Sequence, residues 1–410
     1  MLGHGVRLGE FLRKDRRLQG QLLVGMLVLC GAGCATQNAS MPSKGESSSP
    51  QVFVRELSRG QIECFEPGAM RDDKPDVPAY CETSAVVRDN GSFWVASDKP
   101  LPQKKGAAVF ALAFSSPEKT LAKVNESALQ DAPFDSLRKI EAMAHSSRDG
   151  WVFASTAFDR IAPDKPAWDA FNTLVAWPVG KPLAAQVIEA STRAGVTSSV
   201  SLRQSFSRAL ADSRWPEGPP YYKVEGLAAL PEQRLVFGVR EAGASYKDFT
   251  YEIRLIEARY RVEDGQVRLD TNSFQEVYRA APTHIDGHQL AVSSLLYDET
   301  RNLLWMLTSF EEDDGDLGAY LMHAPADDFT RASAWQVVRE GESETPFVFA
   351  NKAEGMEFVG PNMLVVVFDE DRRVNTGATE ALPMQVARAE NQGAYMLMEV
   401  VSGQKGGAAK

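Results

Sequence analysis

The chain has 410 residues, of which 44% are hydrophobic and 24% are charged, which is the composition of a globular protein and of neither a disordered nor a fibrous one. Its formal net charge is −11, which argues against a general nucleic-acid binder, because such proteins carry a basic patch that neutralises phosphates. The length allows one large domain or two to three small ones.

Residues 1–33 have the features of a secretory signal peptide. Lys and Arg outnumber the acidic residues in this segment and give it a local net charge of +3, so the rest of the chain carries −14. An apolar run follows at 22–29, about half the length that a transmembrane helix needs. Small residues at 31–33 are typical of a cleavage site. We therefore predict that residues 1–33 are removed on export.

Cys34 follows this segment directly, at a position where the chain resembles the bacterial lipoprotein box. Gly31 departs from the box, in which Leu is usual. The alternative is an ordinary signal peptide followed by an incidental Cys. The resemblance implies that Cys34 is lipidated and anchors the protein to the membrane of the bacterial cell envelope. Ala35 comes next, and a non-acidic residue there goes with sorting to the outer membrane, facing the periplasm.

Residues 34–51 are polar and rich in Ser, and they predict a flexible tether. Beyond the tether, the chain contains two Cys residues, Cys64 and Cys81. The loop between them is rich in Pro and Asp and has little to bury. In an oxidising periplasm such a pair predicts a disulfide, the alternative being two free thiols. No other Cys remains to complete a metal site with this pair.

Internal similarity organises the rest of the chain. Five segments share a short apolar strand, a turn and a stronger apolar strand that ends in polar residues: 83–98, 140–159, 224–241, 292–311 and 353–369. A third strand follows each pair, at 108–115, 173–179, 251–262, 319–323 and 394–401, and a fourth follows at 266–270. Antiparallel units of this kind cannot bury both faces alone, so they predict the blades of a β-propeller.

We therefore predict an all-β fold, with a single β-propeller domain over 52–402 and a disordered tail at 403–410. The isolated strand 51–57 could complete the last blade and close the ring. The units begin 57, 84, 67 and 61 residues apart. The longest interval contains 184–214, where apolar residues recur at helical spacing. We predict five blades with a short, partly helical insertion, and the alternative is a sixth, degenerate blade in this interval.

Three of the first strands start with a carboxylate, in Glu141-Ala142, Glu225-Gly226 and Glu354-Gly355. Since the first strand of a propeller blade usually lines the central channel, these side chains should converge at one mouth. Their repulsion requires that one stay protonated or that a cation lie between them. Ligation by oxygen alone favours calcium as that cation. The alternative is that each Glu accepts backbone N–H groups of the neighbouring blade. Gly after Glu permits a close approach of the backbones.

The order of the units resembles the bacterial uncharacterised-domain family 3616. The matching stretches include TSAVV, KIEAMA, KVEGLAAL, DGHQLAVSSLLYD and KAEGMEF, within residues 80–400. More distantly, the chain resembles the esterase-like phytase and gluconolactonase-type propellers, in which Glu-Gly motifs supply acidic ligands for calcium. That resemblance implies Glu141, Glu225 and Glu354 as metal ligands. The first and fourth units depart from the pattern, because they have Ser84 and Ser293 instead.

Polar groups end several of the second strands, at a face of the propeller where loops build sites. These candidate ligand-binding residues are Asp159, Arg240, Glu241 and Asp369. Arg240 would suit an anionic substrate, and the alternative is a surface ion pair with Glu241 or a neighbour. His284 and His288 flank an Asp in the loop PTHIDGHQL, which could bind a metal or move a proton, or could simply be solvated.

The chain has no G-x-S-x-G elbow, no H-E-x-x-H motif, no P-loop and no dinucleotide fingerprint. Two classes of function remain. The first is a propeller of the cell envelope that binds a small molecule or a protein partner, with a divalent cation at the channel mouth. The second is a calcium-assisted periplasmic hydrolase of an ester, phosphoester or lactone, in which the ion acts as a Lewis acid. The sequence assigns neither a substrate nor catalytic residues.

Overall fold

The computed structural model describes residues 52–402 except 105, 107, 116–119, 125–126, 163, 281–282, 313–315, 342, 344 and 370–385. The predicted signal peptide 1–33, Cys34, the tether and the tail 403–410 lie outside the described residues. Within the described part, no helix combines the length and the apolar character needed to cross a bilayer.

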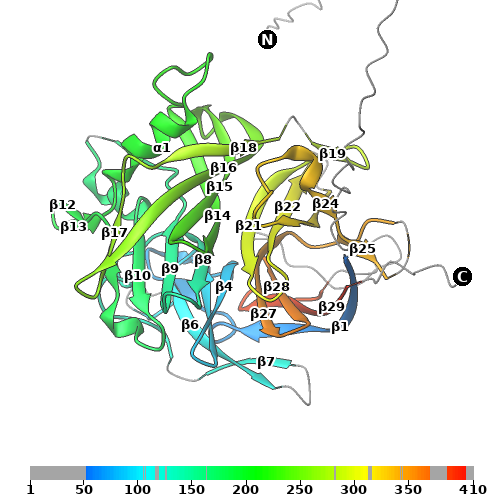
Figure 1. The fold of residues 1–410 in the computed structure, drawn as a ribbon. Coiled ribbons are helices and arrows are strands. Elements are labelled where there is room, and N and C mark those ends of the chain that lie inside the picture. The colour runs from blue at the N-terminus through cyan, green and yellow to red at the C-terminus, as the bar shows by residue number, and fades with distance from the viewer. Residues whose placement is uncertain are drawn as a thin grey trace, which may run out of the picture. The chain divides into compact units, whose positions relative to one another are not determined.

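Five antiparallel sheets form the blades of a β-propeller (Figure 1). Blade I contains β4 (Thr83–Asp89), β5 (Ser92–Ser97), β6 (Val109–Ser115) and β7 (Thr120–Lys123). Blade II contains β8 (Ile140–Ser146), β9 (Trp151–Thr156), β10 (Leu174–Pro178) and β11 (Gln186–Val187). Blade III contains β14 (Tyr221–Leu230), β15 (Arg234–Ser245), β16 (Asp248–Glu263), β17 (Gln266–Leu269) and β18 (Gln275–Arg279). Blade IV contains β21 (Ala291–Asp298), β22 (Leu303–Glu311), β23 (Leu317–Pro325), β24 (Gln336–Val337) and β26 (Val348–Phe349). Blade V contains β27 (Ala353–Gly360), β28 (Met363–Phe368), β29 (Gln392–Ser402), β1 (Val52–Glu63) and β25 (Arg339–Glu340).

The shorter elements lie in the connections between these strands. They are three hairpins, β2 (Met70–Arg71) with β3 (Lys74–Pro78), β12 (Ser191–Arg193) with β13 (Val196–Ser198), and β19 (His284–Ile285) with β20 (His288–Gln289). Three 3₁₀ helices, η1 (Pro166–Phe171), η2 (Pro182–Ala184) and η3 (Ala332–Ala334), and one α-helix, α1 (Leu202–Leu210), complete the described elements.

The first strands of the blades form a closed ring. Strands β4, β8, β14, β21 and β27 each contact the next, and β27 contacts β4. This confirms the prediction of five blades over six. The predicted closing strand is also confirmed, since β1 pairs antiparallel with β29, with Val52 opposite Ser402, and completes blade V. The N-terminal and C-terminal strands of the described chain therefore share one sheet.

The core consists of five apolar clusters, one between each pair of neighbouring blades. Each blade is apolar on both faces, because it packs against a neighbour on either side. The cluster between blades II and III also contains the predicted helical insertion. Leu202, Phe206 and Leu210 of α1 are each 0% exposed there, and the ring of Phe206 contacts those of Phe158 and Phe237. The period of the apolar residues thus predicted the helix correctly.

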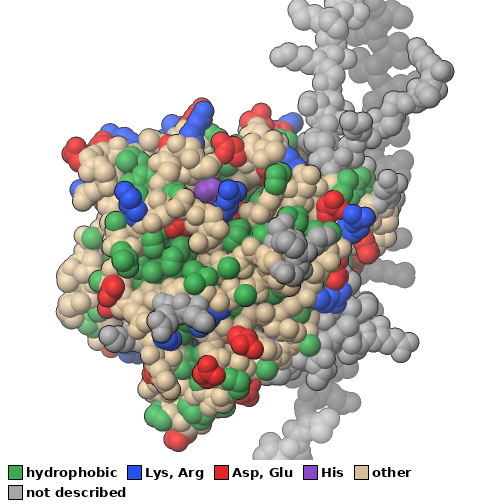
Figure 2. Space-filling view, turned by 90° about the horizontal axis from the view of Figure 1, so that it is seen from below, with side chains coloured by type: hydrophobic (Ala, Val, Ile, Leu, Met, Phe, Trp, Pro, Cys, Tyr) green, Lys and Arg blue, Asp and Glu red, His purple; other side chains and the backbone are tan. Residues whose placement is uncertain are grey.

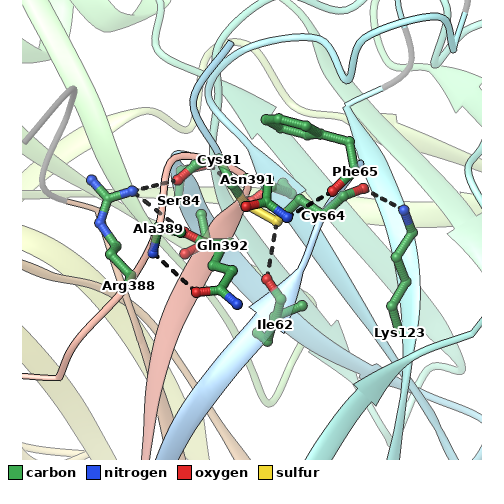
Figure 3. Close-up of a disulfide and its surroundings, with 12 residues drawn as sticks. Ile62, Cys64, Phe65, Cys81, Ser84, Lys123, Arg388, Ala389, Asn391 and Gln392 are labelled. Carbon is green, nitrogen blue, oxygen red and sulfur yellow. Dashed lines mark hydrogen bonds between the residues drawn. A yellow bond between two sulfur atoms is a disulfide. The ribbon is translucent and has the colours of Figure 1, made fainter. Parts of the chain in front are cut away.

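The predicted disulfide between Cys64 and Cys81 is present, and Figure 3 shows its surroundings. It joins the residue that follows β1 to the segment that leads into β4, so it links the closing blade to the first one. The backbone N–H of Cys64 donates to the carbonyl of Asn391, and the N–H of Cys81 donates to that of Glu390, at 2.9 and 2.8 Å. Arg388 donates to the carbonyl of Cys81. The disulfide therefore links blade V to blade I, the two blades between which the ring closes.

Acidic and basic side chains lie close to one another on the face shown in Figure 2, with small hydrophobic patches between them. That face carries no field of a single charge. Clusters of charged residues line the pockets at the two ends of the central channel.

Candidate functional site

Each of the five inner strands contains a β-bulge near its start. In each ladder between the first and second strands of a blade, one residue is skipped: Ser84, Glu141, Glu225, Ser293 and Glu354. A bulge leaves one residue unpaired and changes the direction of its side chain. The repeated bulge therefore places three glutamates and two serines at equivalent positions around the channel.

The three predicted glutamates converge at one end of the channel. One carboxylate oxygen of each lies within 4.8 Å of the others, and all three side chains are buried. The glycines that follow allow this approach, as predicted. A Cβ on Gly226 would lie 2.8 Å from Cγ of Leu295, and a Cβ on Gly355 would lie 2.9 Å from Cα of Ala85.

A lysine two residues before each glutamate supplies the counter-charge. Nζ of Lys223 lies 3.1 Å from Oε1 of Glu141 and also forms an ion pair with Glu225. Lys139 and Lys352 accompany Glu141 and Glu354, at 3.6 and 3.0 Å. The cation between the carboxylates is thus, in this structure, the ammonium group of Lys223.

Arg240, one of the predicted residues, extends this network. It is 1% exposed, so it is not the surface residue that the alternative supposed. Its guanidinium lies 3.4 Å from Glu225, 3.6 Å from Glu241 and 3.8 Å from Glu311. It also donates to Oγ of Ser309 at 2.5 Å. Arg240 therefore connects the inner ring of glutamates to the ends of the second strands.

Burial and charge set the protonation of the glutamates in opposite directions. Burial outweighs the nearby lysines and raises the pKa of Glu141 to about 8 and that of Glu354 to about 7. Burial would raise the pKa of Glu225 too, but Arg240 and Lys223 outweigh it and lower that pKa. The repulsion among the three is therefore relieved both by lysine and by retained protons.

The two serines at the bulge positions link neighbouring blades directly. Oγ of Ser84 donates to the carbonyl of Ile140 in blade II at 2.5 Å, and Oγ of Ser293 donates to that of Ala353 in blade V at 2.7 Å. Among the described residues, the glutamates make no such hydrogen bond to a backbone N–H. The sequence analysis offered the alternative that the glutamates hold neighbouring blades together by accepting backbone N–H groups. In the structure, the hydrogen bonds between blades at these positions are donated by Ser84 and Ser293.

A pocket of about 720 Å³ opens above this network. Its charged lining consists of Lys139, Arg160, Arg203, Lys223, Arg240 and Lys352, with Asp159, Glu241 and Glu311. Its aromatic lining consists of Trp168, Tyr221, Tyr246, Phe249 and Tyr251. The β15–β16 hairpin carries three of these five residues, with Tyr246 in its turn and Phe249 and Tyr251 on β16, so it forms one wall of the pocket. Asp159, Arg240 and Glu241 were predicted to face a ligand, and all three line this pocket.

The other predicted residues lie apart from the pocket. Asp369 belongs to a second buried carboxylate group with Glu82 and Asp98, where Lys99 forms ion pairs with both partners. His284 is exposed on the β19–β20 hairpin. His288 stacks on Phe310 with ring centroids 3.9 Å apart and lies 3.3 Å from Glu312. The structure does not bring either histidine to the pocket.

The sequence analysis missed the three lysines and the aromatic wall. The lysines had a visible signal, because Lys-x-Glu recurs in three units as Lys139, Lys223 and Lys352. The aromatic residues gave no such signal in the sequence. Tyr246 and Phe249 reach the pocket only because the β15–β16 hairpin is long.

The contacts of the three glutamates show how well the site would suit a calcium ion. The oxygen donors suit calcium. The ammonium groups do not, because a divalent ion about 4 Å from one lysine would be repelled by about 8 kcal/mol at an effective dielectric constant of 20. The residues present therefore fit a ring neutralised by lysine better than a calcium site. Calcium ligation by Glu141, Glu225 and Glu354 stays a prediction.

No family model and no curated protein sequence matches the chain. Solved structures similar to it include a glucose dehydrogenase, at 12% identity over 86% of this chain and 100% of that chain, with a TM-score of 0.38. An α-L-arabinofuranosidase from Podospora anserina covers 85% of this chain and 97% of its own, at 9% identity and a TM-score of 0.35. A hypothetical protein from Leishmania major covers 84% and 90%, at 9% identity and a TM-score of 0.38. At these values the likeness concerns the fold and carries no argument about activity.

Proposed function

We propose that the protein binds a small, ring-shaped anion in the pocket at the glutamate end of its channel. The observation that carries this proposal is the composition of the pocket lining, with six cationic residues against three carboxylates in a chain whose net charge is −11. The buried Glu141, Glu225 and Glu354 offset part of this charge from beneath the lysines. Because their raised pKa values keep Glu141 and Glu354 partly protonated near neutral pH, the pocket retains a net positive charge that attracts an anionic ligand.

The aromatic wall indicates the shape of the ligand. Tyr246, Phe249 and Tyr251 offer flat apolar surfaces, and Tyr246 and Tyr251 add hydroxyl groups, which suit the faces and edges of a ring. Tyr221 lies behind them and donates its hydroxyl to Glu241. Tyr246 is 67% exposed at the tip of the hairpin, where contact with a ligand would cover it. A sugar acid has both required features, a ring with hydroxyl groups and a carboxylate.

The second candidate is the calcium-assisted hydrolase. The raised pKa values of Glu141 and Glu354 favour it, because a general acid must hold its proton near neutral pH. Against it, both side chains are at most 3% exposed, and lysines cover them. Binding without turnover is therefore the function that the geometry supports better.

The proposed location is the bacterial cell envelope, with the propeller anchored by a lipid on Cys34 and facing the periplasm at the outer membrane. The basic and apolar segment before Cys34, the resemblance to the lipoprotein box and the non-acidic Ala35 support this placement. In a bacterial host, incorporation of labelled fatty acid into the full chain, and its loss in Cys34→Ser, tests the anchor. Labelling of the Cys34→Ser variant at the level of the full chain would contradict it.

Calorimetry on residues 35–410 tests the binding, with glucuronate as the probe, glucose as the uncharged ring and acetate as the anion without a ring. We expect glucuronate to bind at least about tenfold more tightly than either control. Arg160→Gln and Tyr246→Ala should each weaken it, whereas Arg261→Gln on the distant surface should not. Equal affinities for the three probes would overturn the proposal. Elemental analysis of the same protein tests calcium, and a panel of esters, lactones and phosphoesters tests hydrolysis.

A further inference from the structure

The opposite end of the channel holds a second pocket, of about 700 Å³. The hairpins between the first and second strands of all five blades line it. The inner strands run from the glutamate end to this end, so the two pockets are separated by the length of these strands. None of the residues that line the first pocket lines this one.

The carboxylates in this second pocket already have partners. Glu357 is buried and accepts hydrogen bonds from the backbone N–H groups of Arg88 and Phe358, at 3.0 and 2.7 Å. Asp298 accepts from the side chain of Arg301 at 2.8 Å and from two backbone N–H groups. Glu299 accepts from Ser147. Arg301 therefore neutralises Asp298, and the hydrogen-bonded oxygens of Glu357 and Glu299 are held by donors of the pocket wall.

The cations in the same lining are not paired in this way. The guanidinium groups of Arg88 and Arg148 form no ion pair or hydrogen bond with a residue that the structure describes, and both line the pocket. His145 also lines the pocket, with Nδ1 at 3.8 Å from Oε2 of the buried Glu357. Two arginines with spare donors and a polarised imidazole form a receptor for an anionic oxygen group.

The rest of the lining is apolar. Phe93, Phe114 and Phe358 contribute aromatic rings, and Leu230 and Val359 contribute aliphatic surface. Hydroxyl-bearing aromatic residues are scarce here, with Tyr297 alone among the described lining. The surface therefore favours an apolar ring over a sugar.

We propose that this pocket is a second, independent binding site for an aromatic carboxylate, whose carboxylate meets Arg88, His145 and Arg148 and whose ring packs on the phenylalanines. The proposal does not depend on the function assigned to the glutamate end. The protein would then present two anion sites of different chemistry at the two mouths of one channel.

Calorimetry with benzoate tests this site, with benzyl alcohol as the uncharged probe of the same ring. In the variant Arg88→Gln/Arg148→Gln, the affinity for benzoate should fall by about tenfold or more, while the affinity for benzyl alcohol stays the same. Arg261→Gln/Arg268→Gln is the matched control, because it removes two exposed arginines elsewhere. Both arginines of the pocket are exposed, so the variant should keep the melting temperature of the wild-type protein.

A second measurement separates this site from the one at the glutamate end. Tyr246→Ala should leave the binding of benzoate unchanged, and saturating glucuronate should not displace it. The absence of benzoate binding by the wild-type protein overturns the proposal. Unchanged affinity in the double arginine variant also overturns it, as does displacement by glucuronate.

Discussion

At the scale of single residues, one channel mouth of the described protein holds a connected network of buried charges. A carboxylate at each of three bulges is matched by a lysine two residues earlier, and Arg240 joins them. Such networks are costly to break, since removing one partner leaves an uncompensated charge in a region of low dielectric. Lys223 contacts two of the three glutamates and is therefore the most sensitive member.

Lys223→Met should destabilise the protein by about 3–5 kcal/mol, because it leaves Glu141 and Glu225 without their shared ammonium group. Unfolding by urea measures the loss, and Lys181→Met, at an exposed lysine, is the control. Removing the ammonium group also removes the repulsion toward a divalent ion, so millimolar calcium should stabilise the variant more than the wild-type protein. A loss below about 1 kcal/mol would show that Lys223 is not the essential counter-charge.

His323 gives the stability a dependence on pH. It is 1% exposed, and burial lowers its pKa from 6.5 to about 4. Between these values the unfolded chain binds a proton that the folded chain rejects, so the stability falls as the pH falls from 6.5 to about 4. The full effect is about 3 kcal/mol.

His323→Leu should remove that part of the pH dependence. Between about pH 8 and pH 5, the difference in unfolding free energy between wild type and variant should change by about 2 kcal/mol in favour of the variant. Denaturation at the two pH values measures it. Parallel profiles would mean that the pKa of His323 is the same in the folded and the unfolded protein.

At the scale of strands, the bulge and the glycine after it act together. The bulge directs the side chain at its position into the channel, and the absence of a Cβ at the next position lets neighbouring inner strands approach. Blade II has Ala142 at the position of these glycines, so a Cβ fits there but not in blades III and V.

Gly355→Ala should cost about 2–3 kcal/mol and more than Gly226→Ala. The new Cβ at 355 would lie 2.9 Å from Cα of Ala85 and 3.0 Å from the backbone nitrogen of Val86, neither of which can move alone. At 226 the nearest atom is Cγ of Leu295, a side chain that can rotate. Chemical denaturation of both variants measures the order, and equal costs would show that the seam between blades I and V adjusts freely.

The strands were largely predictable from the sequence, because alternating apolar runs and turn residues such as Asp89-Asn90-Gly91 act locally. The equivalence of Glu141, Glu225 and Glu354 also followed from the repeats. The β-bulges could not be predicted from the sequence, because a residue that is left out of the strand pairing does not change the local pattern of apolar and polar residues. Arg240 was predicted to meet an anionic substrate or to form a surface ion pair, and its burial could not be predicted, because it depends on Glu225 and Glu311 from two other strands.

At the scale of the whole molecule, the ring closes through a strand from each end of the described chain. Because Val52 lies opposite Ser402, a short linker can join these ends without disturbing the fold. The integrity of the ring should therefore depend on β1 being present and not on where the chain begins.

A circular permutant that joins 402 to 52 and opens the chain beside Leu183, which is 74% exposed, should unfold cooperatively and near the melting temperature of the original chain. Deletion of Val52–Glu63 should instead abolish cooperative unfolding, since it uncovers the edge of β29 and the cluster beside it. Scanning calorimetry distinguishes the two. Failure of the permutant to fold would assign β1 a role beyond closure.

The pairing of β1 with β29 also fixes an order of events during biosynthesis. The strand made first must wait for the strand made last, so the nascent chain cannot complete blade V until residue 402 has been added. During that interval β1 is an unpaired strand, and contacts of such long sequence separation form slowly. The Cys64–Cys81 bond needs no such wait, because its partners are 17 residues apart. Oxidation of this pair once the segment reaches the proposed periplasmic compartment would leave β1 tethered beside blade I, where β29 must later pair with it.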